Sequence, residues 1–154
     1  MCGIAGIFDL YESKVKKPAL ESSLEALGHR GPDGQGLFFS SDGRAGMSHT
    51  RLAIIDLSET GAQPMKSADS KCAITFNGEI YNFKSLKSSE LLKDAKFRSN
   101  SDTEVLLQLY QRSSSVSAFV NKCLPILNGI FAFGIWDESE QIGLICRDQF
   151  GVKP

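Results

Sequence analysis

Short apolar runs separated by turn residues predict a chain built largely of β-strands. The first run, Cys2–Leu10, is rich in Ile and Phe and predicts a buried strand. Two further strands, Leu37–Ser40 and Ala45–Ile55, flank an Asp42-Gly43 turn. Three more are expected later in the chain: Cys72–Phe76, which runs straight into Asn77-Gly78, then Asn128–Asp137 and Gln141–Arg147.

Helical spacing of apolar residues appears in four segments. Pro18–Leu27 predicts a short amphipathic helix, and Gly28 is expected to end it. Ser101–Arg112 gives the clearest pattern, because apolar residues line one face and Ser101 and Glu104 form an S-x-x-E capping box. Two weaker helices are expected, at Phe83–Leu92 and at Ser115–Leu127, where Pro125 ends the second.

The order of these elements favours an α+β fold. Strands, helices and strands follow one another without the regular βαβ alternation of parallel sheets, so we expect antiparallel sheets covered by helices. Two segments are expected to be irregular, the glycine-rich loop His29–Gly36 and the polar, turn-rich Asp56–Ser70. The glycine loop lacks the spacing of a phosphate-binding loop and does not join a strand to a helix, which argues against nucleotide binding there.

Composition indicates one ordinary globular domain. The chain has 154 residues, 42% hydrophobic and 23% charged, with a net charge of −1. This charge gives no indication of a nucleic-acid or membrane partner. The four cysteines show no CxxC pair and there are only two histidines, so neither a metal site nor a disulfide framework is expected. Without an evident signal peptide, a cytoplasmic protein with reduced thiols is the expectation.

Cys2 is the first candidate for chemistry. Removal of Met1 would leave a thiol and a free α-amino group on one residue, and an α-amino group can act as a base near neutral pH. Such a residue would supply both the nucleophile and the general base. The structural alternative is a small core residue that opens a strand. Position alone favours that alternative.

Other candidates each have a structural alternative as well. Asn77-Gly78 is typical of a hairpin turn, but the Asn77 amide and the Gly78 N–H could instead form an oxyanion hole. Arg51 could bind a carboxylate through its guanidinium or could be an exposed strand residue. Glu79 and Asp102 could hold an ammonium group, although an acid at position 102 also suits the first turn of a helix. His29 and His49 are interpreted as structural.

Seven motifs together resemble a known family. They are "MCGIAGIF", "HRGPDGQG", "SHTRLAIID" with "GAQPM", "FNGEIYNF", "SDTEV", "LNGIFAFGIWD" and "RDQFGVKP". In this order they resemble the glutaminase domain of class II glutamine amidotransferases, most closely the asparagine synthetase branch. The resemblance covers nearly the whole chain, residues 1–154, and implies the αββα sandwich of N-terminal-nucleophile hydrolases.

The resemblance also implies an activity and a set of site residues. Glutamine would be hydrolysed to glutamate, and the ammonia would be used for ATP-dependent amidation of an acceptor, with aspartate first among the candidates. Cys2 matches the nucleophile, Asn77 and Gly78 the oxyanion hole, and Arg51 the clamp on the α-carboxylate. The remaining matches bind glutamine: Glu79 and Asp102 at the α-ammonium, Leu52 and Ile54 through their backbone.

Two departures limit these expectations. No "SGGxDS"-type loop is present, so we expect a C-terminal synthetase domain in a longer protein, and ATP and Mg²⁺ only there. The chain also carries Met1, and in that form the nitrogen of Cys2 is an amide and turnover should be low. Expected partners are glutamine and the synthetase domain, with a homodimer left open. The alternatives are amidation of a cell-surface sugar or another carboxylate, hydrolysis of another amide, or a non-catalytic scaffold.

Overall fold

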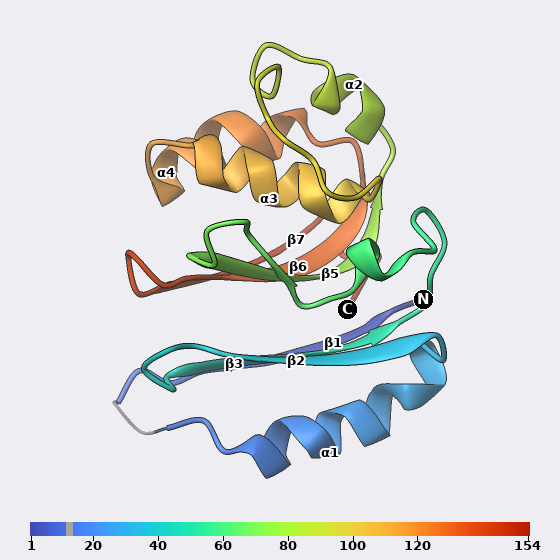
Figure 1. Ribbon diagram of the computed structural model, residues 1–154, viewed down its shortest axis with the longest axis vertical. Helices are drawn as coiled ribbons and strands as arrows, with labels where there is room; N and C mark the ends of the chain where they lie inside the picture. The colour runs from blue at the N-terminus through green and yellow to red at the C-terminus, as the bar shows by residue number, and fades with distance from the viewer. Residues whose placement is uncertain (12–13) are drawn as a thin grey trace.

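Two antiparallel sheets pack face to face in the computed structural model, which describes residues 1–11 and 14–154 (Figure 1). The first sheet has the order β1-β3-β2 and the second the order β4-β5-β6-β7. The strands are β1 (Gly3–Phe8), β2 (Gly34–Phe39), β3 (Ala45–Arg51), β4 (Met65–Lys66), β5 (Cys72–Ile80), β6 (Gly129–Asp137) and β7 (Ile142–Arg147). All neighbouring strands in both sheets are antiparallel, as the sequence predicted.

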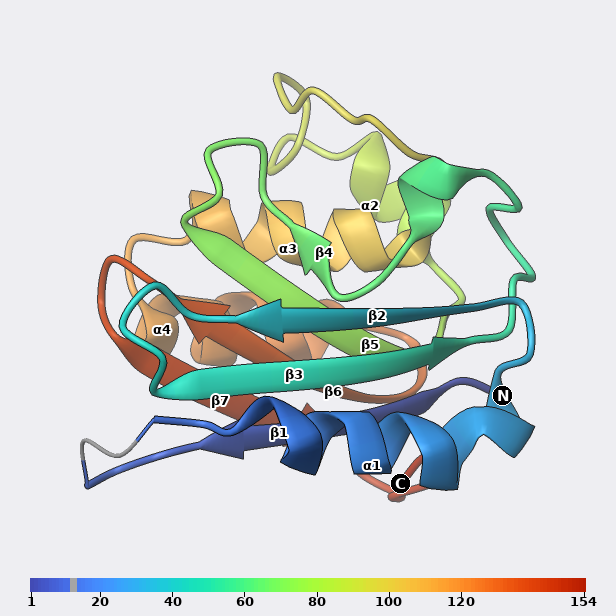
Figure 2. The ribbon, with the colours of Figure 1, turned by 60° about the horizontal axis from the view of Figure 1, so that its bottom comes forward.

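Helices cover both outer faces. Helix α1 (Lys17–Leu27) lies along the first sheet (Figure 2) and inserts the buried Leu20. The second sheet is covered by α2 (Phe83–Lys87), α3 (Asp102–Arg112) and α4 (Val116–Ala118), the last continued by a π-helical turn, Phe119–Cys123, and a 3₁₀ turn, Leu124–Ile126. Shorter 3₁₀ turns occur at Gly28–Arg30 and Glu59–Gly61. The predicted αββα sandwich is confirmed.

Each pair of neighbouring layers encloses apolar side chains. The larger core lies between α3 and the second sheet, where the ring of Phe119 packs edge-on against Tyr110 and Phe133, with centroids 5.3 and 6.5 Å away. A smaller core between the two sheets contains Met47 and Trp136. The layers are therefore held by separate clusters, and the inter-sheet cluster sets how the two sheets face each other.

Strand alternation decides which side chains of β3 face the second sheet. Ser48 and Thr50 point to α1, because Ser48 Oγ lies 2.6 Å from Ser23 Oγ and Thr50 Oγ1 donates to the Leu27 carbonyl (2.9 Å). Met47, His49 and Arg51 alternate with these two residues along β3 and therefore face the second sheet. His49 Nδ1 lies 3.1 Å from Thr75 Oγ1 on β5, which links the two sheets directly.

Several predicted boundaries are wrong. Strand β5 passes through Asn77-Gly78 to Ile80, so this pair is no hairpin turn. Strand β2 begins at Gly34 and takes the last three residues of the expected glycine loop. The two-residue strand β4 lies within the segment expected to be irregular, β3 ends at Arg51 instead of Ile55, and α2 ends at Lys87 instead of Leu92.

Two predicted helix ends are only partly correct. The Ser101 side chain accepts from the Glu104 N–H (3.2 Å), as expected of an N-cap. The Glu104 carboxylate does not return this bond, because it accepts from the N–H groups of Arg98 (2.9 Å) and Ser99 (2.6 Å). Helix α1 ends where predicted, but Gly28 keeps a right-handed conformation (φ −53°) and the chain continues into a 3₁₀ turn.

Candidate active site

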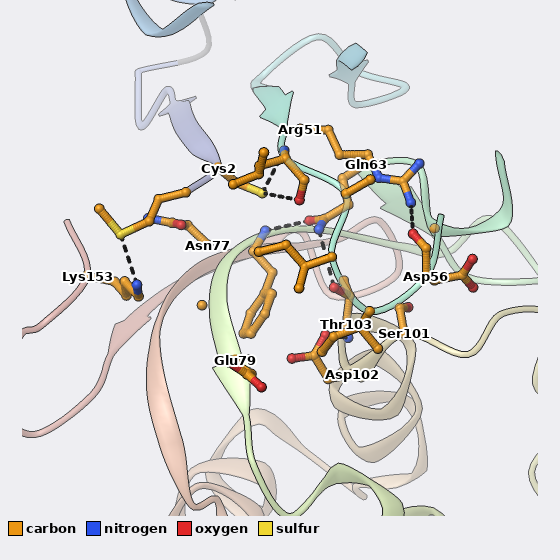
Figure 3. Close-up of a pocket in the computed structure, with 18 of the residues that line it drawn as sticks. Cys2, Arg51, Asp56, Gln63, Asn77, Glu79, Ser101, Asp102, Thr103 and Lys153 are labelled. Atoms are coloured by element: carbon orange, nitrogen blue, oxygen red, sulfur yellow. Dashed lines mark hydrogen bonds between the residues drawn. The ribbon is translucent and has the colours of Figure 1, made fainter. Parts of the chain in front are cut away.

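One cavity at the end of the sandwich collects all eight residues that the sequence singled out. Cys2, Arg51, Leu52, Ile54, Asn77, Gly78, Glu79 and Asp102 all line it (Figure 3). They come from the residue before β1, the end of β3 and the loop that follows it, the end of β5 and the first turn of α3. The volume of the cavity is about 120 Å³, below the roughly 300 Å³ at which pockets for drug-sized ligands begin. This size suits a ligand as small as an amino acid.

Cys2 is fixed by contacts on both of its sides. The Leu52 N–H donates to Cys2 Sγ at 3.3 Å, and the sulfur lies 3.7 Å from the Leu52 carbonyl oxygen. Arg30 Nε donates to the Cys2 carbonyl (3.0 Å). The next residue is Gly3, where a Cβ would lie 2.5 Å from Thr50 Oγ1 and 2.8 Å from Leu27 Cβ, so glycine leaves room for these two side chains. The sulfur is thereby held at the mouth of the cavity.

Strand β5 extends beyond its neighbour β4, and this exposes its edge to the cavity. Along an antiparallel strand, alternate residues direct their N–H groups to the same side. The last pair in the β4–β5 ladder toward the cavity is Met65 with Ile74. Further along that edge, the Phe76 N–H donates to Gln63 Oε1 (2.7 Å) and the Ile80 N–H to Asp102 Oδ2 (2.9 Å).

Gly78 lies between Phe76 and Ile80 in this series. By the same alternation its N–H points away from β6 and toward the cavity, beyond the end of β4. A Cβ at this position would lie 2.3 Å from the Ile130 carbonyl oxygen on β6, so the close packing of the two strands requires glycine. Local packing and the open edge together leave one backbone donor facing the cavity.

The Asn77 side chain provides a second free donor. Asn77 is 2% exposed, and its Nδ2 is buried with no hydrogen-bond partner among the described residues. A buried polar group without a partner costs about 1–3 kcal/mol. Asn77 also lines the cavity close to Cys2 (Figure 3). A donor in this condition would be satisfied by an acceptor in the cavity.

Arg51 is anchored to the loop that borders the cavity. Its Nη1 donates to the Ser58 carbonyl (3.0 Å), and its Nη2 donates to the Asp56 carbonyl. A Cβ on Gly61 would lie 2.4 Å from Arg51 Nη2, so the guanidinium packs directly on that glycine. The charge of Arg51 is therefore placed at one wall of the cavity by a loop folded around it.

Asp56 holds the same loop in place. Its carboxylate accepts from the Ser58 hydroxyl (2.6 Å) and from the Asn100 N–H (2.8 Å). These hydrogen bonds, that of the Ser58 hydroxyl first, lower the pKa of Asp56 to about 2, and the Arg51 charge adds to the effect. The bond to Asn100 ties the loop to the residue that precedes the Ser101 cap of α3.

Asp102 and Glu79 bring negative charge to the opposite wall. Asp102 is 4% exposed, and burial raises its pKa to about 6, although the hydrogen bonds from Ile80 and Thr103 act in the other direction. The charge of Glu79 raises the pKa of Asp102 further. Glu79 itself is exposed at the rim of the cavity. The Arg51 guanidinium and these two carboxylates thus lie on different walls of the cavity, which Asp56 and Lys153 also line.

The sequence analysis missed three residues that support the site. Arg30 holds the Cys2 carbonyl, Asp33 Oδ2 accepts from the Ala53 N–H (2.9 Å), and Gln63 holds the edge of β5. They belong to the "HRGPD" and "GAQPM" motifs, which we used only as marks of a family. These three residues could have been found from the sequence, because they are polar residues within the motifs to which no role had been assigned.

Comparison with known proteins decides the family. The chain matches the family described as a glutamine amidotransferase domain over residues 1–154. The chain belongs to this family. The glutamine amidotransferase fold is also seen in a solved structure, the glutamine phosphoribosylpyrophosphate amidotransferase of B. subtilis complexed with ADP and GMP. It aligns with a TM-score of 0.79 and 25% identity over 99% of this chain and 38% of that one.

Full-length relatives of this glutamine amidotransferase domain include asparagine synthetases, which confirms the predicted branch. This chain is 37% identical to glutamine-hydrolysing asparagine synthetase 1 of Bacillus subtilis, over 100% of this chain and 23% of that protein. It is 41% identical to a probable asparagine synthetase of Dictyostelium discoideum, over 100% of this chain and 26% of that protein. Amidase chry2 of Gibberella zeae is 35% identical, over 99% and 23%. The chain spans about a quarter of the length of these relatives.

The described residues contain neither a cluster of metal-ligating side chains nor a membrane-spanning helix. Among residues 1–11 and 14–154, no group of three or more His, Cys, Asp or Glu side chains is arranged to hold a metal ion. In the same residues, no helix is long and apolar enough to cross a membrane.

Proposed function

We propose that this domain hydrolyses glutamine to glutamate and releases ammonia at the cavity that contains Cys2. The observation that carries the proposal is a pair of donors on the wall of the cavity that also holds the thiol. They are Asn77 Nδ2, which has no partner among the described residues, and the Gly78 N–H, which strand alternation directs toward the cavity. A tetrahedral intermediate of amide hydrolysis needs donors for its oxyanion and a nucleophile beside them. The charges of Arg51 and Asp102 complement the α-carboxylate and α-ammonium of a free amino acid.

The proposed reaction passes through a thioester. The α-amino group of Cys2, free once Met1 is removed, takes the thiol proton while sulfur bonds to the side-chain carbonyl carbon of glutamine. The resulting oxyanion is stabilised by Asn77 and Gly78. The C–N bond then breaks, and the nitrogen leaves with the transferred proton as ammonia. Water attacks the thioester, the C–S bond breaks, and glutamate leaves with the thiol restored.

Met1 determines whether this chemistry can run. In the structure Met1 lines the cavity, and its Sδ accepts from Lys153 Nζ at 2.9 Å. With Met1 attached, the nitrogen of Cys2 is an amide and cannot act as a base. We therefore propose that removal of Met1 activates the domain, both by freeing the amine and by clearing the cavity.

We further propose that the ammonia serves the ATP-dependent amidation of a carboxylate by a C-terminal synthetase domain. Because the relatives include asparagine synthetases, aspartate is the first acceptor to test. We also propose that the protein is cytoplasmic and that ATP and Mg²⁺ bind the synthetase domain. A homodimer also remains a proposal.

The experiment that tests this function measures glutamate released from glutamine by the purified protein, with removal of Met1 verified by mass. We expect turnover in the processed protein and none in Cys2→Ala. Cys146→Ala is the matched control, because this partly buried thiol lies on β7 and should leave turnover unchanged. Turnover in Cys2→Ala would contradict the nucleophile assignment.

The same assay separates glutamine from other amides. Arg51→Ala should raise KM for glutamine at least tenfold, because the lost contact is to a part of the substrate that does not react. Arg112→Ala, at the far end of α3, is the control and should not change KM. If glutaminamide, which lacks the α-carboxylate, reacts as fast as glutamine, then the domain is a hydrolase for another amide.

A further inference from the structure

Beyond the end of β4, the side chain of Gln63 forms a hydrogen bond with the exposed edge of β5 where a neighbouring strand would otherwise pair. Beyond the last β4 pair, Gln63 Oε1 accepts from the Phe76 N–H at 2.7 Å, in the place where a backbone carbonyl of a longer β4 would lie. Only Pro64 separates Gln63 from Met65, the first residue of β4. Its amide therefore continues the ladder of the sheet by one step toward the cavity.

The other end of the Gln63 amide reaches α3. Its Nε2 donates to Thr103 Oγ1 (3.2 Å), and Thr103 follows Asp102, whose carboxylate accepts from the Ile80 N–H. Both edge donors that flank Gly78 are thus occupied by side chains, Gln63 on one side and Asp102 on the other. Gln63 connects the two supports to each other, because it binds the strand and the first turn of α3 together.

The backbone of Gln63 is held in turn by the first sheet. A Cβ on Gly36 of β2 would lie 2.1 Å from the Gln63 carbonyl oxygen, a distance that real Cβ atoms do not adopt. Glycine at position 36 therefore allows the Gln63 segment to lie against β2. As a result, the position of the Gln63 amide is set by contacts to both sheets and to α3.

We propose that Gln63 is a positioning residue for the oxyanion hole, and that its amide fixes the direction of the Gly78 N–H. The inference rests on the proposed glutaminase function and names a further residue that this reaction requires. Without Gln63, the Phe76 N–H loses its partner and the strand edge next to Gly78 is free to rotate. An oxyanion donor acts through its alignment with a charge that exists only in the transition state. Loss of alignment therefore lowers kcat while the binding of glutamine, which uses other groups, is retained.

The test compares Gln63→Met, which removes both hydrogen bonds at similar volume, with Gln63→Glu, which keeps an acceptor for the Phe76 N–H. We expect Gln63→Met to lower kcat by about 10- to 100-fold and to change KM for glutamine less than about threefold. Gln63→Glu should recover most of the lost kcat. Gln63→Asn, one methylene too short to reach Phe76, serves if Gln63→Met does not fold, and should show the same loss as Gln63→Met.

A second variant reaches the same amide without touching it. Gly36→Ala should push the Gln63 segment away from β2 and reproduce the kcat loss. Gln111→Met is the matched control, since the amide of Gln111 bonds Asp69 (3.2 Å) at the other end of α3. This control should keep the wild-type kcat.

A binding measurement separates positioning from a general structural role. An analogue in which an aldehyde replaces the side-chain amide of glutamine forms a tetrahedral adduct with Cys2, with sulfur bonding to carbon and the thiol proton moving to oxygen. Gln63→Met should weaken this adduct in proportion to its loss of kcat, and its affinity for glutamate should not change. Equal weakening of both ligands, or a kcat within twofold of wild type, would overturn the role of Gln63. If the processed wild-type protein itself releases no glutamate, then the proposed function fails, and the inference fails with it.

Discussion

At the scale of single residues, the cavity combines groups that the folded protein holds in unfavourable states. Asn77 Nδ2 is buried with no partner among the described residues, and Asp102 carries a raised pKa. Each state is relieved by a ligand of the right chemistry, an oxyanion for Asn77 and an ammonium for Asp102.

Asp102 predicts a pH dependence of glutamine binding. Because the pKa of Asp102 is about 6, the carboxyl becomes protonated below that pH and loses its charge for the ammonium. In Cys2→Ala, where no reaction interferes, we expect the Kd for glutamine to rise as pH falls from 7.5 to 5. Asp102→Asn should bind weakly at every pH. Calorimetric titration at four pH values would show this, and a constant Kd in Cys2→Ala would contradict it.

His49 predicts a pH dependence of stability. It is 0% exposed, and burial, followed by the Arg51 charge, lowers its pKa to about 3. Between pH 6.5 and 3 the unfolded chain binds a proton at His49 that the folded protein does not bind. The contribution of His49 to the free energy of unfolding should therefore fall as the pH is lowered through this window, by at most about 1.4 kcal/mol per pH unit, and should be constant above it.

The variant His49→Gln removes this titration and keeps a polar group near Thr75. Urea unfolding of both proteins at pH 7, 6, 5 and 4 measures the contribution of His49 as the difference between them. We expect the difference in unfolding free energy to change steadily below pH 6.5. A difference that stays constant down to pH 4 would mean that His49 is protonated in the folded protein.

At the scale of elements, the site depends on where β5 and α3 start and end. The Ser101 cap fixes the first turn of α3, which carries Asp102, so Ser101→Ala should lower the unfolding free energy by about 1 kcal/mol and raise KM for glutamine. Ser115 is the matched control, because it caps α4 by the same type of bond (3.1 Å) far from the cavity. Thermal unfolding and KM measured on both variants check this. A KM change in Ser115→Ala would contradict the link between cap and site.

Elements also show how far the sequence alone could predict the fold. The pattern of apolar residues found the α3 helix and every strand except β4, because these segments carry apolar runs or helically spaced apolar positions. It could not show that β5 continues through Asn77-Gly78, because local preference there favours a turn and the pairing with β6 overrides it. Strand β4 was missed because two residues give no periodic signal. The helix predicted over Phe83–Leu92 was too long, because its last apolar residues pack from an irregular segment after α2 ends at Lys87.

The same distinction holds for the site. Six of the eight candidate residues were found because each carries chemistry, whereas Leu52 and Ile54 came only from the resemblance to the family. The structure brings all eight to one cavity, and their roles stay predictions. Gln63 and Asp33 were missed because their importance lies in partners 13 and 20 residues away in the chain. Such contacts follow from the packing of the layers, which no single motif reports.

At the scale of the whole molecule, the site is divided between the two sheets. Cys2 and Arg51 belong to the first sheet, whereas Asn77 and Gly78 belong to the second. The proposed nucleophile and the proposed oxyanion donors therefore keep their relative positions only as long as the sheets stay packed. The inter-sheet core around Met47 is what sets this distance.

Met47→Ala tests this dependence. It should lower the unfolding free energy by about 2–5 kcal/mol, and it should also lower kcat, because the cavity it creates lies between the sheets. Leu109→Ala, in the core between α3 and the second sheet, should cause a similar loss of stability with kcat unchanged. Urea unfolding and glutamine turnover would be measured on both. Equal effects on kcat would contradict the claim.

The measurement that tests the account most directly is the intact mass of the purified protein before and after treatment with a diazo-ketone analogue of glutamine. The first mass reports whether Met1 has been removed, and the second reports whether one thiol is activated by a site that accepts glutamine. We predict that the purified protein lacks Met1 and forms a single adduct, which is absent in Cys2→Ala and retained in Cys146→Ala. A protein that lacks Met1 and still forms no adduct would contradict a glutaminase site at Cys2.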